Sequence, residues 1–373
     1  MHRNRPPEEA PRVILAVISD LATDQRVHRV ALALHEAGWS VHVVGRLYTG
    51  AADLLPVPYH RSRLNVQARA GKLMYLEFNV KLLLALGKMP ADVLTANDLD
   101  TLLPCWLVAS LRRRRLVYDS HELFTEVPEL VGRPLTRWLW ERLEGLIFPR
   151  LQRVSVVSQS ISDHYFRKYK KRPDVIRNLP LPLGQPPGWD EVSSRERVLL
   201  YQGALNQGRG IELMIDTMLL LPDWELWIAG EGDLSAQLRE RAATSAAVER
   251  IRFWGRLRPE ALQEVTRQAR IGFSLEEDLG LNYRYALPNK LFDYIQCRVP
   301  SIVSNLPEMA RVVHERGVGL ILRHRSPAAL ADLVRLLGES PQRYALWVEA
   351  CDLAAQDLHW DAEKKRLLQL YAH

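Results

Sequence analysis

The chain has 373 residues, of which 47% are hydrophobic and 25% are charged. This composition is that of a globular protein, and the length suggests about two domains. No apolar run approaches the roughly 18 residues that a membrane-spanning helix needs. The three cysteines, Cys105, Cys297 and Cys351, lie far apart, which argues against a disulfide framework and against a C-x-x-C zinc site.

The net charge of +6 is unevenly distributed along the chain. Residues 1–185 hold 27 Lys or Arg and 18 Asp or Glu, whereas residues 186–373 hold 23 and 26. The basic excess gathers in three segments, at 61–72, 112–115 and 168–172, and the apolar Tyr75, Phe78, Leu82 and Leu83 lie near the first of them. A cationic and partly apolar surface favours contact with an anionic membrane, although a solvated helix face explains the charges equally well.

The first half of the chain alternates apolar strands with amphipathic helices. Residues 12–18 form a nearly continuous apolar run, which is typical of a parallel strand covered on both faces, and we interpret them as a first core strand and not as part of a signal peptide. Helix 26–37 follows and ends at Gly38. Further strands are predicted at 40–44, 92–96, 115–119, 153–157 and 174–177, and helices at 99–111, 134–149 and 159–169.

The composition changes after residue 178. Residues 179–194 are rich in proline and glycine and predict a linker without regular structure, which we place at 181–195. The alternation then restarts, with strands at 197–202, 224–229, 250–254 and 270–275 and helices at 209–220, 234–243 and 259–268. We therefore predict two doubly wound α/β domains, 1–180 and 196–357, and a helical end at 358–373.

The segment from Ser274 to Glu308 contains the strongest functional signal. Acidic residues at a strand end are followed by an irregular loop, a short helix at 288–297 that Pro288 opens, and a buried strand at 300–304. A helix N-terminus directs backbone N–H groups and a positive dipole end into the loop, which attracts phosphate. Lys290 adds a positive charge, and Asp293 can accept hydrogen bonds from sugar hydroxyls. An ordinary turn with a solvated Lys and Asp remains the alternative.

Two further turns in the second half suit a diphosphate. Gly203 ends a strand, and Arg209 stands at the predicted start of the next helix, so that backbone amides and a guanidinium converge. Gly230 and Gly232 follow another strand and allow close approach of the backbone. Plain strand-to-helix turns would explain both segments as well.

In the first half, polar side chains follow three predicted strands. His121 comes just after strand 115–119 and could hydrogen-bond a sugar or stabilise charge; alternatively it caps the next helix or pairs with Glu122. Asp98 and Asp100 form a D-x-D pair that could hold a metal, but helix capping by Asp98 is the simpler interpretation. The role of the Asp24 and Arg26 pair stays open.

The stretch PNKLFDYIQCRVPSIVSN resembles the donor-binding segment of family 4 glycosyltransferases, which are GT-B enzymes with a retaining mechanism. In many of them a PNK-F-E-Y stretch stands where others have the second half of an E-x7-E motif, and Asp293 corresponds to the second Glu of that motif. The first acidic residue is either Glu276 or Glu277, with 279–287 as an insertion. The resemblance spans nearly the whole chain and is strongest at 95–126 and 270–308.

This resemblance implies a GT-B fold, in which two Rossmann-like domains face each other across a cleft, and a final helix that crosses back to the first domain. It implies transfer of a sugar from a nucleotide diphosphate sugar to a hydroxyl of a glycan or lipid-linked acceptor in cell-surface polysaccharide or lipopolysaccharide synthesis. No metal, no cofactor besides the donor and no nucleic acid is expected. The location implied is the cytoplasm, where the protein could also lie at the inner face of the cell membrane. The catalytic candidates are His121, Glu276 and Glu277, and the donor-binding candidates are Gly203, Arg209, Gly230, Gly232, Asn289, Lys290 and Asp293.

Two rival functions remain open. A nucleotide-sugar 2-epimerase has the same two-domain plan and would convert its substrate without an acceptor. A non-catalytic binding protein on the same fold is the other rival, since Ala204 stands where relatives carry an Arg and the loop after the first strand lacks glycine.

Overall fold

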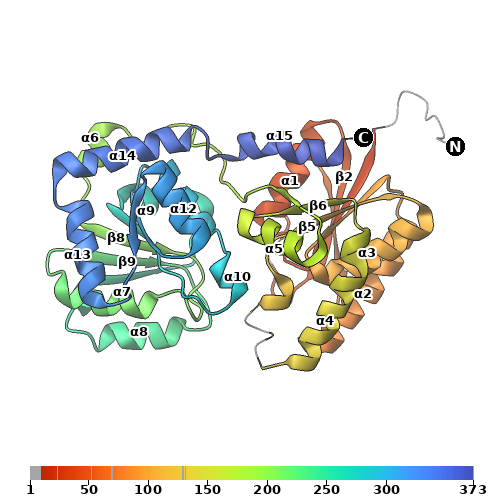
Figure 1. The fold of residues 1–373 in the computed structure, drawn as a ribbon, viewed down its shortest axis with the longest axis horizontal. Coiled ribbons are helices and arrows are strands. Elements are labelled where there is room, and N and C mark those ends of the chain that lie inside the picture. The colour runs from red at the N-terminus through yellow and green to blue at the C-terminus, as the bar shows by residue number, and fades with distance from the viewer. Residues whose placement is uncertain are drawn as a thin grey trace. The chain divides into compact units, whose positions relative to one another are not determined.

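The computed structural model describes residues 10–22, 24–51, 53–68, 70–127, 130 and 132–372. Residues 1–9 of the predicted first domain, residue 69 of the predicted basic segment and residue 373 of the predicted helical end lie outside the described residues. The chain divides into two compact units. Unit 1 holds the chain up to Arg177 and again from Glu363, and unit 2 runs from Asn178 to Ala362. Figure 1 shows a sheet with helices packed around it in each unit.

Unit 1 contains a sheet of seven strands, and all of its strand pairs are parallel. The strands are β1 (Arg12–Ala16), β2 (Ser40–Leu47), β3 (His60–Asn65), β4 (Val93–Asn97), β5 (Arg115–Ser120), β6 (Arg153–Val156) and β7 (Asp174–Val175). Their order in the sheet is β3-β2-β1-β4-β5-β6-β7. Every residue of β4 is buried, as expected of a central parallel strand. The predicted mostly parallel sheet is thus confirmed, and β3 is an edge strand that the sequence analysis did not identify.

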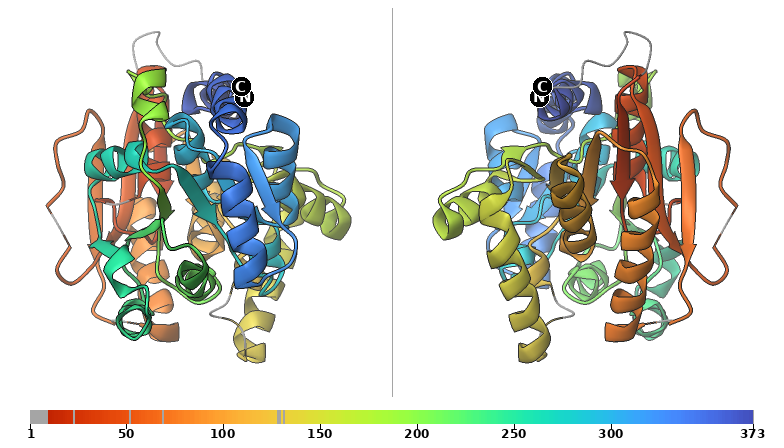
Figure 2. Two further views of the ribbon diagram at one scale, coloured as in Figure 1. Left: turned by 90° about the vertical axis from the view of Figure 1, so that its left-hand side faces the viewer. Right: turned by 90° about the vertical axis from the view of Figure 1, so that its right-hand side faces the viewer.

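The helices of unit 1 are α1 (Gln25–Glu36), α2 (Gly71–Lys88), α3 (Leu99–Arg112), α4 (Pro134–Ile147) and α5 (Gln159–Tyr169), with short 3-10 turns η1 (Phe124–Glu126) and η3 (Phe148–Arg150). Helix α2, which was not predicted, packs against α3, and α3 packs against α4. The right-hand view of Figure 2 shows these three helices, in orange, brown and yellow, on the same side of the sheet.

Unit 2 contains a parallel sheet of six strands in the order β10-β9-β8-β11-β12-β13. The strands are β8 (Val198–Gln202), β9 (Glu225–Ala229), β10 (Ile251–Gly255), β11 (Ile271–Ser274), β12 (Ser301–Ser304) and β13 (Gly319–Leu322). In both units the carboxyl ends of the strands lie at one edge, where ligands of such sheets bind.

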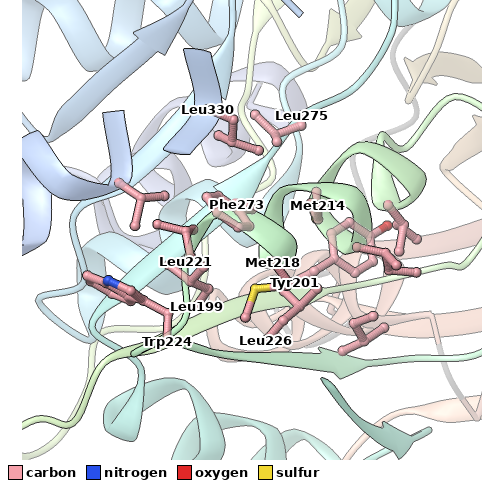
Figure 3. Packing of buried hydrophobic residues seen from close by; sticks show 14 of the residues in the cluster. Leu199, Tyr201, Met214, Met218, Leu221, Trp224, Leu226, Phe273, Leu275 and Leu330 are labelled. Carbon is pink, nitrogen blue, oxygen red and sulfur yellow. The ribbon is translucent and has the colours of Figure 1, made fainter. Parts of the chain in front are cut away.

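The helices of unit 2 are α6 (Trp189–Ser193), α7 (Ile211–Thr217), α8 (Ser235–Ala243), α9 (Pro259–Gln268), α10 (Leu281–Arg284), α11 (Asn289–Gln296), α12 (Pro307–Arg316), α13 (Pro327–Gly338) and α14 (Pro341–Ala355), with 3-10 turns η4 (Met218–Leu220) and η5 (Val248–Arg250). One core cluster fills the space between the sheet and helices α7 and α13 (Figure 3). Met214, Trp224, Phe273 and Leu330 are among its buried side chains.

Two segments predicted to be irregular contain short helices. Helix α6 lies inside the predicted linker. Gly188 is its N-cap, and the buried Val192 packs against Tyr344 and Val348. Helix α10 lies in the predicted insertion at 279–287, where Tyr283 is buried. Both predictions of irregular structure were wrong, since a few buried side chains stabilise these helices.

The chain ends in helix α15 (Trp360–Tyr371), which contributes its later residues to unit 1. The Tyr371 hydroxyl lies 2.9 Å from Thr95 Oγ1 on β4, and the Glu363 carboxylate accepts hydrogen bonds from Arg177, 2.6 Å from Nη2. Tyr371 and Glu363 are almost fully buried.

Candidate functional site

A buried carboxylate, Glu276, lies just beyond the carboxyl end of β11 in unit 2. Its Oε1 accepts a hydrogen bond from Lys290 Nζ at 2.9 Å and lies 3.6 Å from Arg209 Nη1, and its Oε2 accepts one from Ser274 Oγ at 2.8 Å. Burial alone would raise the pKa of Glu276, but Lys290 and Arg209 outweigh it, and the pKa lies below its ordinary value. The structure therefore brings three predicted site residues together as a charged cluster.

Glu277, the other candidate for the first acidic position, has different surroundings. Its backbone N–H donates to the Gly208 carbonyl at 2.8 Å, and its partly exposed carboxylate lies 3.3 Å from Arg325 Nη2. Of the two carboxylates it is therefore Glu276 that reaches Lys290 and Arg209, whereas Glu277 reaches Arg325.

Lys290 is held from several sides. Only 8% of its surface is exposed, and Nζ lies 4.1 Å from the centroid of the Tyr201 ring. Gly203 has a φ of 130°, and a Cβ there would come within 3.4 Å of Lys290 Cε. Lys290 and Gly203 are thus close together, while Asn289 is exposed at the first position of α11. The sequence predicted that Pro288 is the first residue of this helix, but Pro288 is its N-cap, with an extended backbone.

Asp293 lies one turn further along α11. Its Oδ2 accepts a hydrogen bond from Gln202 Nε2 at 2.8 Å, and Gln202 Oε1 accepts one from Thr266 Oγ1 at 2.8 Å. The end of β8 and helix α9 therefore fix the orientation of this carboxylate.

Gly230 and Gly232 serve a purpose that the sequence analysis did not foresee. Gly230 has a φ of 149°, and a Cβ there would lie 1.8 Å from the Gly203 carbonyl oxygen. A Cβ on Gly232 would lie 2.6 Å from the Leu205 backbone nitrogen. The close approach at these two positions is thus between the loops after β8 and β9.

The sequence predicted that Arg209 begins helix α7. Arg209 instead precedes the helix, because Gly210 is a left-handed N-cap with a φ of 73°. The Arg209 guanidinium lies 5.1 Å from the centroid of the Tyr283 ring, and the Tyr283 hydroxyl donates to the Gln207 carbonyl at 2.9 Å. The segment 279–287 therefore packs, through Tyr283, on the loop that carries Arg209.

Arg325, in the loop after β13, was missed by the sequence analysis. Its Nη1 donates to the Leu275 carbonyl at 3.1 Å and to Ser304 Oγ at 2.9 Å, and its Nη2 lies near Glu277. It stabilises the chain on both sides of Glu276. No local pattern marks Arg325, because its contacts are with β12 and with the residues just after β11, far away in the sequence.

In unit 1, the imidazole of His121 lies between two carboxylates. Its Nε2 is 3.1 Å from Asp119 Oδ2, and its Nδ1 is 3.1 Å from Asp98 Oδ2. Burial alone lowers the pKa of His121, but the two carboxylates outweigh it and raise the pKa to about 10. Both ring nitrogens thus contact carboxylates, those of Asp98 and Asp119, and the raised pKa favours the cationic ring at neutral pH.

Asp98 adopts an unusual backbone conformation beside His121. Its φ of 61° and ψ of 170° belong to a region that is nearly confined to glycine and costs about 1–3 kcal/mol. The predicted capping of α3 by the Asp98 side chain was wrong. The Asp98 Oδ1 instead accepts a hydrogen bond from the His121 backbone N–H at 2.7 Å. Such strain is most often retained at functional positions, where the surrounding structure supports it.

Asp119 is also bound by Arg26 from helix α1. Arg26 Nε and Nη2 donate to the two Asp119 oxygens at 3.0 and 2.8 Å, and both side chains are buried. Burial alone would raise the pKa of Asp119, but Arg26 and His121 hold it far below its ordinary value. Asp24 instead caps α1 through the Val27 N–H, so the two members of the predicted pair have separate roles.

The two aspartates of the D-x-D pair, Asp98 and Asp100, differ in their surroundings. No group of three or more His, Cys, Asp or Glu side chains among the described residues is arranged to hold a metal ion. Asp100 is buried, and its Oδ1 has no hydrogen-bond partner within the described part of the chain. Burial, with Asp98 and Glu122 nearby, raises the pKa of Asp100 well above its ordinary value, which favours the protonated acid.

Two parallel α/β units, each with charged groups beyond the carboxyl ends of its strands, are the plan of a GT-B glycosyltransferase. Residues 23–182 match the family model described as glycosyl transferase 4-like domain, and residues 196–339 match the one described as glycosyl transferases group 1. The chain therefore belongs to the glycosyltransferases of the GT-B type. Compared with curated protein sequences, it has no significant match.

Solved structures confirm the predicted fold. Sucrose-phosphate synthase from Thermosynechococcus elongatus has a TM-score of 0.77 at 19% identity, with 97% of this chain and 98% of that chain covered. WaaG, a glycosyltransferase involved in lipopolysaccharide biosynthesis, has a TM-score of 0.75 at 13% identity, with 97% and 100% covered. HepE of Anabaena in complex with UDP-glucose has a TM-score of 0.75 at 13% identity, with 96% and 99% covered.

Proposed function

We propose that this glycosyltransferase moves a sugar from a nucleotide diphosphate sugar to a hydroxyl group of a glycan or lipid-linked acceptor, with retention of anomeric configuration. The observation that carries the proposal is the cluster of Lys290, Arg209 and Glu276 beyond β11. A departing nucleoside diphosphate gains negative charge, which preorganised cations stabilise best in a buried site. The similar fold of HepE, whose structure contains UDP-glucose, supports this donor class.

The residues of unit 2 have distinct roles in this proposal. Lys290, Arg209 and the N-terminus of α11 at Asn289 would stabilise the diphosphate, so that no divalent metal is required. Glu276, and not Glu277, would bind the sugar hydroxyls, because it is the carboxylate that contacts both cations. Asp293 would hold the ribose.

His121 would act as a cationic hydrogen-bond donor and not as a base. Both ring nitrogens contact carboxylates, so neither has a free lone pair with which to accept a proton. The Asp98 side chain is 19% exposed, whereas that of Asp119 is 4% exposed. A sugar hydroxyl would therefore replace Asp98 on Nδ1 more readily than it would replace Asp119 on Nε2.

We place the reaction in the cytoplasm, at the inner face of the cell membrane, in the synthesis of cell-surface polysaccharide or lipopolysaccharide. The acceptor is then a growing glycan or its lipid-linked form. The basic excess of the first half of the chain supports contact with anionic lipid.

Donor binding can be tested by thermal unfolding in the presence of UDP-, GDP- and other nucleotide sugars. A ligand at 100 times its dissociation constant adds about 2.7 kcal/mol to stability. We expect the correct donor to stabilise the wild type, and Lys290→Ala and Asp293→Ala to abolish that effect. Asp332→Ala and Lys365→Ala, which change exposed residues elsewhere, are the matched controls. Unchanged stabilisation in both site variants would contradict the assignment.

Product analysis separates transfer from the rival reaction. With an acceptor and EDTA present, we expect a new glycosidic bond of retained configuration, and no change of the donor when the acceptor is left out. Conversion of the nucleotide sugar without an acceptor would indicate an epimerase instead.

A further inference from the structure

Helix α2 has an apolar stripe on each of two opposite faces. Met74, Phe78, Leu82 and Leu86 are buried against the rest of unit 1, whereas Leu73, Leu76, Val80 and Leu84 are exposed. A surface helix normally presents one apolar face and one polar face. The outer stripe of α2 therefore has no counterpart within the described part of the chain. It is not the stripe that the sequence analysis selected, because Phe78 and Leu82 belong to the core.

The same feature continues on the neighbouring helices. Leu135, Trp138, Leu139 and Leu146 of α4 are at least half exposed, and Leu111 at the end of α3 is 86% exposed. Of the 22 large hydrophobic side chains that are exposed among the described residues, ten lie on α2, α3 and α4. We call the exposed side of these three helices the α2–α4 surface. So dense a group of exposed apolar side chains marks an interaction site.

The helices form one layer, so that their exposed sides belong to one face of the unit. Helix α2 packs on α3 and α3 on α4, and the rings of Tyr75 on α2 and Trp140 on α4 meet edge to face with centroids 5.7 Å apart. Figures 1 and 2 both show the three helices side by side.

The charge of the α2–α4 surface indicates its partner. Residues 71–89, 99–114 and 133–147 contain nine Lys or Arg and four Asp or Glu, a formal charge of +5 out of +6 for the whole chain. Two of the four acids, Asp100 and Glu144, are buried, and the other two, Glu77 and Glu141, pair with Lys81 and Arg137. Asp92 and Glu126, just outside these segments, pair with Arg114 and Arg137, and the exposed side remains net positive.

We propose that the α2–α4 surface binds an anionic lipid bilayer at the level of its headgroups. Leucines and a tryptophan would enter the interface while the surrounding Lys and Arg contact lipid phosphates. Arg142, whose guanidinium lies 5.3 Å from the centroid of the Trp138 ring, combines both kinds of contact in one pair. Among the described residues, no helix is long and apolar enough to cross a membrane, so the contact is peripheral.

A second copy of the chain fits this surface less well. Self-association through the same face would bring two surfaces of charge +5 against each other, which is electrostatically unfavourable. An anionic bilayer accepts both the apolar side chains and the charge. The inference extends the proposed function by naming the surface that brings the enzyme to a lipid-linked acceptor.

The test is co-sedimentation of the full chain with vesicles of phosphatidylcholine, with and without phosphatidylglycerol. We expect binding to the anionic vesicles only, weakened by salt. Leu76→Ser/Leu84→Ser should lower the partition coefficient at least tenfold, and so should Arg113→Glu/Arg142→Glu. Leu346→Ser/Leu353→Ser on α14, which changes two equally exposed leucines, should leave it unchanged.

Three outcomes would overturn the inference: no binding by the wild type, equal binding by Leu76→Ser/Leu84→Ser, or light scattering that shows a dimer which this variant dissociates. All variants change exposed side chains, and circular dichroism would verify their folding. Thermal stabilisation by the nucleotide sugar is measured on the same variants. A variant that loses vesicle binding but is still stabilised by the nucleotide sugar shows that the two proposals, membrane binding and donor binding, are tested independently.

Discussion

Replacing His121 should change how the stability of the protein depends on pH. The two carboxylates beside the ring raise its pKa to about 10, from 6.5 for an unperturbed histidine. Between these pH values the folded protein retains a proton that the unfolded chain has released. The stabilisation from His121 is therefore complete below pH 6.5, decreases as the pH rises and is lost above about pH 10.

The size of the effect follows from one proton. A difference of one bound proton corresponds to about 1.4 kcal/mol per pH unit. From about pH 7 to pH 9, the wild type should thus lose about 2.7 kcal/mol of unfolding free energy that His121→Gln does not lose. Glutamine can still donate to one carboxylate, but it does not titrate.

Urea unfolding of the full chain, followed by tryptophan fluorescence at both pH values, measures this difference. His60→Gln, which changes an exposed histidine of unit 1, is the control and should follow the wild type. Nitrogen-detected NMR of the imidazole at about pH 8 should show both ring nitrogens protonated. Equal pH slopes for the wild type and His121→Gln would refute the assignment of a buried imidazolium.

Three further predictions concern unit 2. Gly230→Ala should destabilise the protein by about 3 kcal/mol or more in thermal unfolding, because the new Cβ would overlap the Gly203 carbonyl, whereas Gly184→Ala, at an open position, should not. Arg325→Ala should cost about 1–3 kcal/mol by calorimetry, since two acceptors lose their donor. Glu276→Gln should bind the free nucleoside diphosphate about tenfold more tightly, because Lys290 and Arg209 lose their counter-charge. The same variant should transfer the sugar much more slowly. Weaker nucleotide binding by Glu276→Gln would contradict this prediction.

The parts of the fold that sequence predicts well are those whose burial is uniform. Strands such as β1 and β4 are buried along nearly their whole length, as parallel central strands are. The edge strand β3 was missed because its sequence, HRSRLN, is polar. Helix α2 was missed because apolar residues lie on two of its faces and obscure the helical period.

The sequence predicted which residues form the candidate site but not which of their side chains contact one another. Lys290, Arg209 and an acidic residue were expected together, but the choice between Glu276 and Glu277 depends on which way each side chain points. The pairing of Asp119 with Arg26 spans 93 positions and arises only when the start of α1 comes within reach of the end of β5. Local capping rules predicted that the Asp98 side chain caps α3. It instead accepts from the backbone N–H of His121, just after β5, and contacts the His121 ring.

The position of α15 bears on how the protein folds during synthesis. Unit 1 contains strands that leave the ribosome before those of unit 2, yet Thr95 and Arg177 have partners at Tyr371 and Glu363. All of unit 2 must be translated before these contacts can form, so the nascent first unit exposes apolar surface for most of translation. A chaperone that binds such surface should associate with ribosomes carrying chains shorter than about residue 363 and should be released once α15 has emerged.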